Sequence, residues 1–396
     1  MADKFSVPSR EFRFVAACCA RPLTRERLEM LERSAREPLD WARVSRLVAL
    51  HRIDGLVNEA LIQSGAAVPP DKKDEFTKRA SALVRENLEI TAEAIRLKRL
   101  FASAGISLLF LKGITLAVVA YGNIGIRHGK DIDLLVAPED ATAATSLIEN
   151  AGYRRDDPPP ELNEAMVQSL RPVRKDLTLH HRTRDFEVEL HWRPLDNRYV
   201  MGGVSPATSS QDVRVGTDIT LATLAEKDLF AYLCAHGANH CWYRLKWIAD
   251  ICAILGTSPE RIESLYRAAS ERGVGPAAGQ ALLLCRRLFA SPVPDTLLQR
   301  LRASLRVRWL ERIALWAMTS GNEQRVPPDL PFGATKITLS RYLLRSGLGY
   351  WLTELRIQMT STRDMVMLPL PKPLRFLYPL LHIPLALCRR MLGGAH

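Results

Sequence analysis

KDIDLLV, residues 130–136, is the stretch that decides the fold of this chain. It predicts a strand over 131–136 in which Asp131 and Asp133 share one side, because residues two apart in a strand point the same way. Adjacent carboxylates repel each other unless a cation lies between them, and Ile132 and Leu134 make the strand core-like, where unpaired charges are costly. Carboxylate oxygens at this spacing suit Mg²⁺. Surface strands also carry such pairs, so the pair alone does not define a site.

The segments on either side predict a small mixed sheet. Upstream, an apolar run is suited to a strand buried on both faces, and Lys112-Gly113 ends it. Downstream, Pro138 opens a helix, and two alternating runs predict a hairpin. The expected order is strand 106–111, helix 115–121, strand 131–136, helix 138–150, strand 177–181 and strand 186–192. We therefore expect an α+β fold with a small mixed-sheet core.

Helical regions flank this core. A long helix is predicted from about Asp71 to Ser103, and helical patterning returns from Leu224 to about Met318. At 396 residues the chain is long enough for two or three compact units. We divide it into an N-terminal helical region (1–104), an α/β core (105–200), a helical region that completes the cleft (201–330) and a C-terminal helical, proline-containing tail (331–396).

The composition favours anionic partners. Lys plus Arg outnumber Asp plus Glu by 55 to 43, which suits a nucleotide, a nucleic acid or a membrane surface, or simply serves solubility. Basic residues are spread along the chain instead of collecting with aromatic residues, so nucleic-acid binding has no specific support. The seven cysteines form no CxxC pair and no disulfide framework, which indicates reduced thiols and a cytoplasmic protein.

Two apolar stretches bear on membrane contact. Residues 14–20 lie within an amphipathic helical pattern and not in a signal sequence, and no run of ~20 apolar residues predicts a spanning helix. The segment 374–388 is strongly apolar but is interrupted by Pro379 and Pro384. It is expected to dock on the body of the protein. Contact with a membrane surface through 374–390, beside Arg389 and Arg390, is the alternative.

A later strand supplies further acidic groups. Glu187, Glu189 and His191 share one face of the strand 186–192, and the aspartate pair needs a third carboxylate if two ions are to bind there. The alternative is a solvated polar face on an edge hairpin. Glu187 and Glu189 lie on the same side of the strand, so the alternation of side chains does not show which of them is the third carboxylate. Glu189 lies further from the turn, at a more central position, whereas Glu187 can stay solvated or pair with Arg182 or Arg184.

Lys112 and Gly113 stand between the first buried strand and a helix. Glycine permits close backbone approach, and the free N–H groups of a helix N-terminus bind phosphate. Lys112 and Arg127 add positive charge for a triphosphate. A single glycine at such a turn is common, and its position just before the Asp131 strand is what gives it weight.

His236 and His240, four residues apart, share a helix face. The spacing fits two zinc ligands, but the HExxH motif is absent and no third ligand stands nearby, so packing against aromatic residues or lining a cleft is favoured. Arg244 and Lys246 are expected either to form ordinary ion pairs, such as Lys246 with Asp250, or to contact substrate.

These motifs together resemble a known family. The matching residues are Leu109-Phe110-Leu111-Lys112-Gly113, Tyr121-Gly122, Arg127, the strand 131–136, Gly152-Tyr153, Glu189-Leu190-His191-Trp192, and selected positions from His236 to Asp250. Over about residues 35 to 260 the chain resembles the uncharacterised bacterial nucleotidyltransferase family of the polymerase-beta-like superfamily. The resemblance rests on the combination of the motifs KG, RxxxDxD and ExHW. None of these motifs alone is specific enough to indicate the family.

The resemblance implies roles for the site residues. Gly113 and the helix after it correspond to the phosphate-binding turn, Asp131 and Asp133 to the metal-binding pair, and Glu189 to the third carboxylate. The implied reaction is in-line attack of an acceptor hydroxyl on the α-phosphate of a nucleoside triphosphate such as ATP. Pyrophosphate is released, and the cofactor is Mg²⁺, with Mn²⁺ as an alternative. Glu189 is also a candidate to accept the hydroxyl proton.

Three departures from the family pattern concern the same end of the site. Ile114 follows the turn glycine, where relatives often have Gly or Ser, so Thr115 is the nearest hydroxyl. Lys130 precedes the aspartate pair, where relatives often have a small residue, and it is expected to neutralise the carboxylates or contact the nucleotide. The gap from Gly113 to the pair is also long, which leaves the loop 122–130 without a predicted position.

Other functions remain open on the same residues. A non-catalytic nucleotide-binding or partner-binding module is one alternative, since a fold does not determine an activity. An RNA-acting transferase is another, suggested by charge alone. The sequence identifies neither the base nor the acceptor, which could be a small molecule, a peptide or a protein.

Overall fold

A five-stranded sheet lies at the centre of the fold, with the strand order β1-β2-β5-β4-β3. The structure, a computed structural model, describes residues 8–319 and 333–393, with side chains as far as residue 388. The strands are β1 (Leu108–Phe110), β2 (Asp131–Val136), β3 (Tyr153–Asp157), β4 (Asp176–His181) and β5 (Glu187–His191). β2 and β5 run parallel, and the other neighbours are antiparallel. The predicted α+β fold with a mixed sheet is confirmed.

The register of β2 and β5 brings the acidic residues together. Asp131 lies beside Glu187, and Asp133 lies beside Glu189. The alternate residues of both strands, such as Leu134, are buried in the core on the other face of the sheet. β5 lies between β2 and β4, so the interpretation of its polar side as the solvated face of an edge hairpin is wrong.

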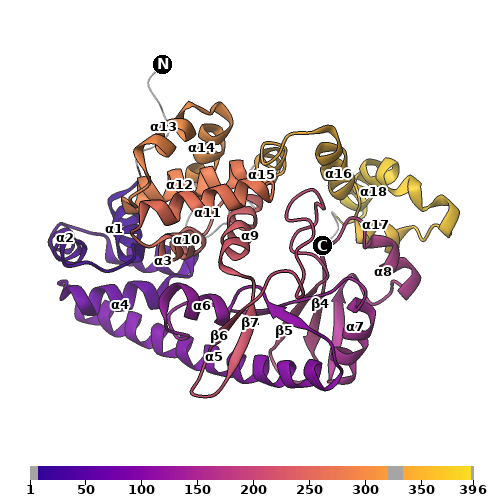
Figure 1. Cartoon of the computed structure of the whole chain (residues 1–396), viewed down its shortest axis with the longest axis horizontal. Coiled ribbons are helices and arrows are strands. Elements are labelled where there is room, and N and C mark those ends of the chain that lie inside the picture. The colour runs from indigo at the N-terminus through magenta and orange to yellow at the C-terminus, as the bar shows by residue number, and fades with distance from the viewer. Residues whose placement is uncertain (1–7, 320–332, 394–396) are drawn as a thin grey trace.

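Helix α5 (Pro70–Ser103) runs along one face of the sheet, with α7 (Ala141–Asn150) at its far end (Figure 1). Leu97 and Phe101 of α5 are fully buried against the sheet. Pro70 occupies the first helical position, where its missing N–H would have no intrahelical partner. The long helix predicted from Asp71 to Ser103 is confirmed.

Apart from α8 (Glu164–Leu170), the remaining helices before residue 320 build a larger core on the other side of the sheet, which Leu109 and Leu135 enter from β1 and β2. They are α1 (Arg10–Cys19), α2 (Arg25–Ala35), α3 (Trp41–His51), α4 (Asp54–Ser64), α6 (Ile114–Tyr121), α9 (Glu226–Asn239), α10 (Leu245–Leu255), α11 (Pro259–Glu271), α12 (Gly275–Phe289), α13 (Asp295–Ala303) and α14 (Leu305–Thr319). Both helical stretches predicted around the core are therefore present.

Four short elements were not predicted. They are β3, α8 (Glu164–Leu170) and the hairpin of β6 (Gln211–Arg214) and β7 (Thr220–Thr223). β3 lies at the edge of the sheet and reads Tyr-Arg-Arg-Asp-Asp, in which Tyr153 alone is buried. A strand with one apolar residue has no alternation to detect.

The last C-terminal elements gather with α8 at one end of the molecule (Figure 1). They are α16 (Leu348–Gln358), α17 (Thr362–Met367), the 3-10 helix η2 (Lys372–Leu377) and α18 (Tyr378–Gly393), whereas α15 (Gly333–Arg341) packs against α9 and α14. Tyr378 is buried in a cluster with Met166 and Leu170 of α8, so the segment 374–388 docks on the body through one face. The side chains of Arg389 and Arg390 lie outside the described residues. None of the helices in the described ranges has the length and apolarity needed to cross a membrane.

Candidate active site

Acidic side chains meet on the polar face of β2 and β5. Asp133 is 2% exposed, whereas Asp131 and Glu189 are partly exposed. An oxygen of Asp133, an oxygen of Glu189 and a ring nitrogen of His191 lie within 4.8 Å of one another, and so do oxygens of Asp131, Glu187 and Glu189. Glu189 belongs to both groups and therefore occupies the middle of the acidic site.

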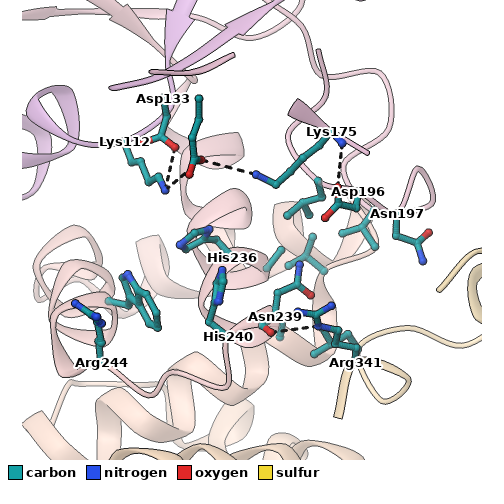
Figure 2. A pocket seen from close by; sticks show the side chains of 18 of the residues that line it. Lys112, Asp133, Lys175, Asp196, Asn197, His236, Asn239, His240, Arg244 and Arg341 are labelled. Carbon is teal, nitrogen blue, oxygen red and sulfur yellow. Dashed lines mark hydrogen bonds and ion pairs between the residues drawn. The ribbon is translucent and has the colours of Figure 1, made fainter. Parts of the chain in front are cut away.

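Two lysines neutralise these carboxylates. Lys112 Nζ, from the turn after β1, lies 2.9 Å from Oδ1 of Asp133 and 4.0 Å from Oε2 of Glu189 (Figure 2). Lys175 Nζ lies 2.5 Å from Oδ2 of Asp176 and 4.0 Å from the same oxygen of Glu189. The site therefore holds positive charge within reach of each buried carboxylate.

The pKa values of the two central carboxylates are shifted in opposite directions. Burial raises the pKa of Asp133, although Lys112 opposes the shift. Burial also acts to raise the pKa of Glu189. The contact with His191 Nε2, 3.3 Å away, and the charges of Lys112 and Lys175 nevertheless hold that pKa well below its usual range. A carboxylate that releases its proton so readily is better suited to binding a cation than to accepting a proton.

The donor set fits a divalent metal ion. Oδ1 of Asp133 and Nε2 of His191 are buried, and within the described part of the chain neither makes a hydrogen bond of good geometry. The ammonium of Lys112 approaches Asp133 as an ion pair, in the position where a cation is needed. Carboxylate oxygens suit Mg²⁺ and Mn²⁺, and an imidazole nitrogen is tolerated better by Mn²⁺. Asp133, Glu189 and His191 could hold such an ion, and Asp131, Glu187 and Glu189 form a second candidate set.

A turn at Gly113, for which phosphate binding was predicted, leads into α6. Gly113 directly precedes α6 and has φ +74°. Residues with a side chain rarely adopt this backbone conformation. Lys112 and Gly113 line a cavity, so α6 begins at the edge of that cavity, and its first N–H groups have no partner within the helix. Thr115 is not brought to this cavity, because it is fully buried and its hydroxyl donates to the carbonyls of Phe110 (3.2 Å) and Lys112 (3.3 Å).

Arg127 is held in a buried ion pair. Its Nε lies 2.9 and 3.0 Å from the two carboxylate oxygens of Asp250, which also accepts a hydrogen bond from Tyr121 (3.0 Å). Asn87 donates to the carbonyls of Ile124 (2.7 Å) and Arg127 (2.9 Å). The guanidinium thus fixes the loop 122–130 against α10, and its charge is largely compensated before any ligand binds.

Lys246 does not pair with Asp250 in the expected way, since Asp250 is engaged by Arg127. Its Nζ donates instead to the carbonyl of His128 (3.4 Å). Burial lowers the pKa of Lys246 to about 7, and the neighbouring charge of Arg127 adds to the shift. This lysine is therefore a cation that an anionic ligand would help to keep protonated.

A cavity of about 470 Å³ joins these groups. Four basic residues are among those that line it, namely Arg52, Lys130, Arg244 and Lys246, and we call them together the basic wall. For Arg52 and Lys130 the described residues provide no ion pair. Figure 2 shows His236 and His240 between the Lys112–Asp133 pair and the far end of the cavity, where Asn239 accepts a hydrogen bond from Arg341.

The far end of the cavity was not predicted. It is lined by residues of the C-terminal tail and of the segment after β5, namely Asp196, Asn197, Arg341, Tyr350, Glu354 and Ile357. Arg52 and Lys175 were also missed as site residues. Arg52 stands beside His51 in a part of the chain that shares the family resemblance, and the others carry no local pattern.

The fold and the site define a nucleotidyltransferase core, with a parallel pair of acidic strands next to a glycine turn at a helix N-terminus. A family model described as an uncharacterised nucleotidyltransferase matches residues 37–290, and the chain belongs to this family. The match contains the turn, all three carboxylates and the two histidines of the cavity, and it confirms the resemblance seen in the motifs. No curated protein matches the chain. Membership of the family supports a general nucleotidyl transfer activity.

Proposed function

We propose that the chain is a metal-dependent nucleotidyltransferase that moves a nucleoside monophosphate from a nucleoside triphosphate to an acceptor hydroxyl. The observation that carries the proposal is the facing pair Asp133 and Glu189 at the edge of a cavity that the basic wall also lines. A bond forms between the acceptor oxygen and the α-phosphorus, the bond to the bridging oxygen breaks, and pyrophosphate leaves with the electron pair. The hydroxyl proton passes to a carboxylate of the site.

The site residues fall into two groups, one that would hold the metal ion and one that binds the phosphates. When bound, Mg²⁺ or Mn²⁺ would be held by Asp131, Asp133 and Glu189 and would neutralise charge on the phosphate oxygens. The N–H groups of the turn at Gly113 and the basic wall bind the phosphates from the other side, since a helix N-terminus and unpaired cations both attract anions. Lys130, which directly precedes β2 and lines the same cavity, is a further basic residue close to Asp131 in the sequence.

The base is proposed to bind at an aromatic cluster in the same cavity. His236, His240, Tyr243 and Trp247 all line it. The ring centroids of His240 and Trp247 are 5.3 Å apart, and those of Tyr243 and Trp247 are 4.9 Å apart. Burial lowers the pKa of His240 to about 3 and that of His236 well below its usual range, so both rings are neutral and can donate and accept. Among the described residues neither imidazole has a hydrogen-bond partner, which leaves both for a base edge.

Calorimetry with ATP, GTP, CTP and UTP, each with and without Mg²⁺, tests the proposal. We expect metal-dependent binding of at least one triphosphate and its loss in Asp133→Asn, which removes charge but little volume. Asp212→Asn, on an exposed position of β6, is the matched control and should bind as the wild type does. If none of the four binds in a metal-dependent way, the proposal fails.

Release of pyrophosphate separates catalysis from binding alone. The ammonium of Lys112 between two carboxylates is also compatible with a non-catalytic nucleotide-binding module, in which the lysine takes the place of the metal ion. Binding without pyrophosphate release in the presence of varied acceptors would favour that module. Binding of RNA with a steep salt dependence would favour the RNA-acting alternative.

A further inference from the structure

The C-terminal helices expose an apolar face that the proposed reaction does not use. On α18, Leu380, Ile383 and Leu387 are 72%, 59% and 54% exposed, and their spacing places them on one side of the helix. Phe376 and Leu374, in the preceding 3-10 helix, are 69% and 43% exposed. We call these five residues the C-terminal apolar face. Exposed apolar side chains that gather in this way mark an interaction surface.

The opposite side of α18 is anchored, so the C-terminal apolar face is held outward. Tyr378 is buried, and its hydroxyl donates to the carbonyl of Leu368 (3.0 Å) and accepts from the N–H of Leu370 (2.8 Å). His382 Nδ1 lies 2.7 Å from a carboxylate oxygen of Asp364, which is fully buried in α17. Turning the apolar face inward would break these contacts.

The charges in the sequence that carries the face are all positive. The sequence from 365 to 396 contains no Asp or Glu, Lys372 precedes the apolar residues, and Arg375 lies between Leu374 and Phe376. Arg389 and Arg390 follow in the sequence. Apolar side chains flanked by cations complement a lipid surface with anionic headgroups, because the acyl region takes the former and the headgroups pair with the latter. A second copy of the chain would instead bring the same positive charges together.

We propose that the C-terminal apolar face binds the surface of a lipid bilayer that contains anionic headgroups. The contact is peripheral, with α18 lying along the surface. It would hold the cavity close to the bilayer, because Ile357 lines the cavity and also packs against the cluster that anchors Tyr378. The contact needs no nucleotide, so its test is independent of transfer activity.

Sedimentation of the full chain with vesicles tests the contact. Vesicles of phosphatidylcholine alone are compared with vesicles that also contain phosphatidylglycerol. We expect the protein to sediment preferentially with the anionic vesicles and to be released by salt, which screens the charges. The double variant Leu380→Glu/Ile383→Glu should bind more than about tenfold more weakly. Lys372→Gln should bind about fivefold more weakly.

A matched control comes from elsewhere on the surface. Leu305→Glu changes a leucine of α14 that is 65% exposed and outside the face, and it should bind vesicles as the wild type does. Thermal melting of each variant checks folding. The proposal is overturned if wild type ignores anionic vesicles or if the double variant binds them equally well. It is also overturned if light scattering shows a wild-type dimer that the double variant dissolves, without vesicle binding, since the face would then join two copies.

Discussion

Replacing Lys112 with methionine isolates the charge that neutralises the acidic site. Lys112→Met keeps the length of the side chain and removes the ammonium 2.9 Å from Asp133. Both side chains are largely buried, so Asp133 would be left as an uncompensated charge. Removing one partner of a buried pair costs about 3–5 kcal/mol. The ring of His191, 3.5 Å from the same oxygen, offers partial compensation, so we expect a loss of about 3 kcal/mol in the free energy of unfolding.

Urea unfolding near neutral pH, with divalent metal removed, measures this loss. Adding Mg²⁺ should then restore stability in the variant more than in the wild type, because Lys112 no longer competes for the carboxylates. An ion that binds only the folded state adds about 2.7 kcal/mol at a concentration one hundred times its dissociation constant. Lowering the pH should also shrink the deficit. Burial raises the folded pKa of Asp133, so the cost is absent at low pH and appears as the pH rises through that value.

Two results would refute this reasoning. One is a variant that loses less than about 1 kcal/mol, which is the range of an exposed ion pair. The other is a variant whose stability does not respond to Mg²⁺, which would mean that the carboxylates do not form a cation site. Lys130→Met removes an exposed lysine of the same cavity and serves as the control. We expect it to stay within about 0.5 kcal/mol of the wild type.

Three further changes test separate parts of the structure. Glu189→Gln should lower metal-dependent pyrophosphate release far more than Glu187→Gln, because Glu189 belongs to both candidate ligand groups. Lys246→Met should flatten the pH dependence of stability. With a folded pKa of about 7 and an unfolded value of about 10.4, the unfolded state binds more protons in that window, so wild-type stability rises with pH there. Gly237→Ala should destabilise the fold by about 1–3 kcal/mol in urea unfolding, because its methyl carbon would lie 2.3–2.5 Å from the ring of Trp242.

For each of these three predictions, one experimental result would contradict it. A metal-bound structure with Glu187 within about 2.0–2.1 Å of Mg²⁺ and Glu189 turned away would reverse the choice of glutamate. An unchanged pH profile in Lys246→Met would mean that this lysine titrates as an ordinary exposed one. Gly216→Ala adds a methyl group where nothing lies within 4 Å, and a loss equal to that of Gly237→Ala would rule out the steric explanation.

The strands that carry the carboxylates could be predicted because their information is local. β2 spans Asp131–Val136, as its sequence indicates, and Glu189 shares one side of β5 with Glu187 because side chains alternate along a strand. The register of β5 on β2, which the sequence does not give, places Glu189 beside Asp133. Thr115 shows the limit of such reasoning. It is the hydroxyl nearest to the turn in the sequence, but the first turn of α6 directs it into the core, where it donates hydrogen bonds to backbone carbonyls.

Contacts distant in sequence account for most of what could not be predicted. Arg127 and Asp250 are 123 positions apart, and nothing in either neighbourhood shows that they pair. Glu187 was expected to stay solvated or to pair with Arg182 or Arg184. It lies 3.1 Å from His180 across the hairpin, while Arg184 pairs with Glu93 of α5. In both cases the partner is chosen by how separate elements pack, which local patterns do not record.

The loop 122–130, pinned by Asn87 and by the Arg127–Asp250 pair, makes one wall of the cavity rigid before any ligand arrives. A ligand that reaches Lys130 meets a surface already in its bound shape, so little conformational entropy is lost on this side of the complex. The rate of association is then governed by diffusion and by attraction to the basic wall, and not by the closing of a loop. This wall therefore discriminates between ligands by how well their shape and charge fit a rigid surface. Such a surface favours rapid binding and release.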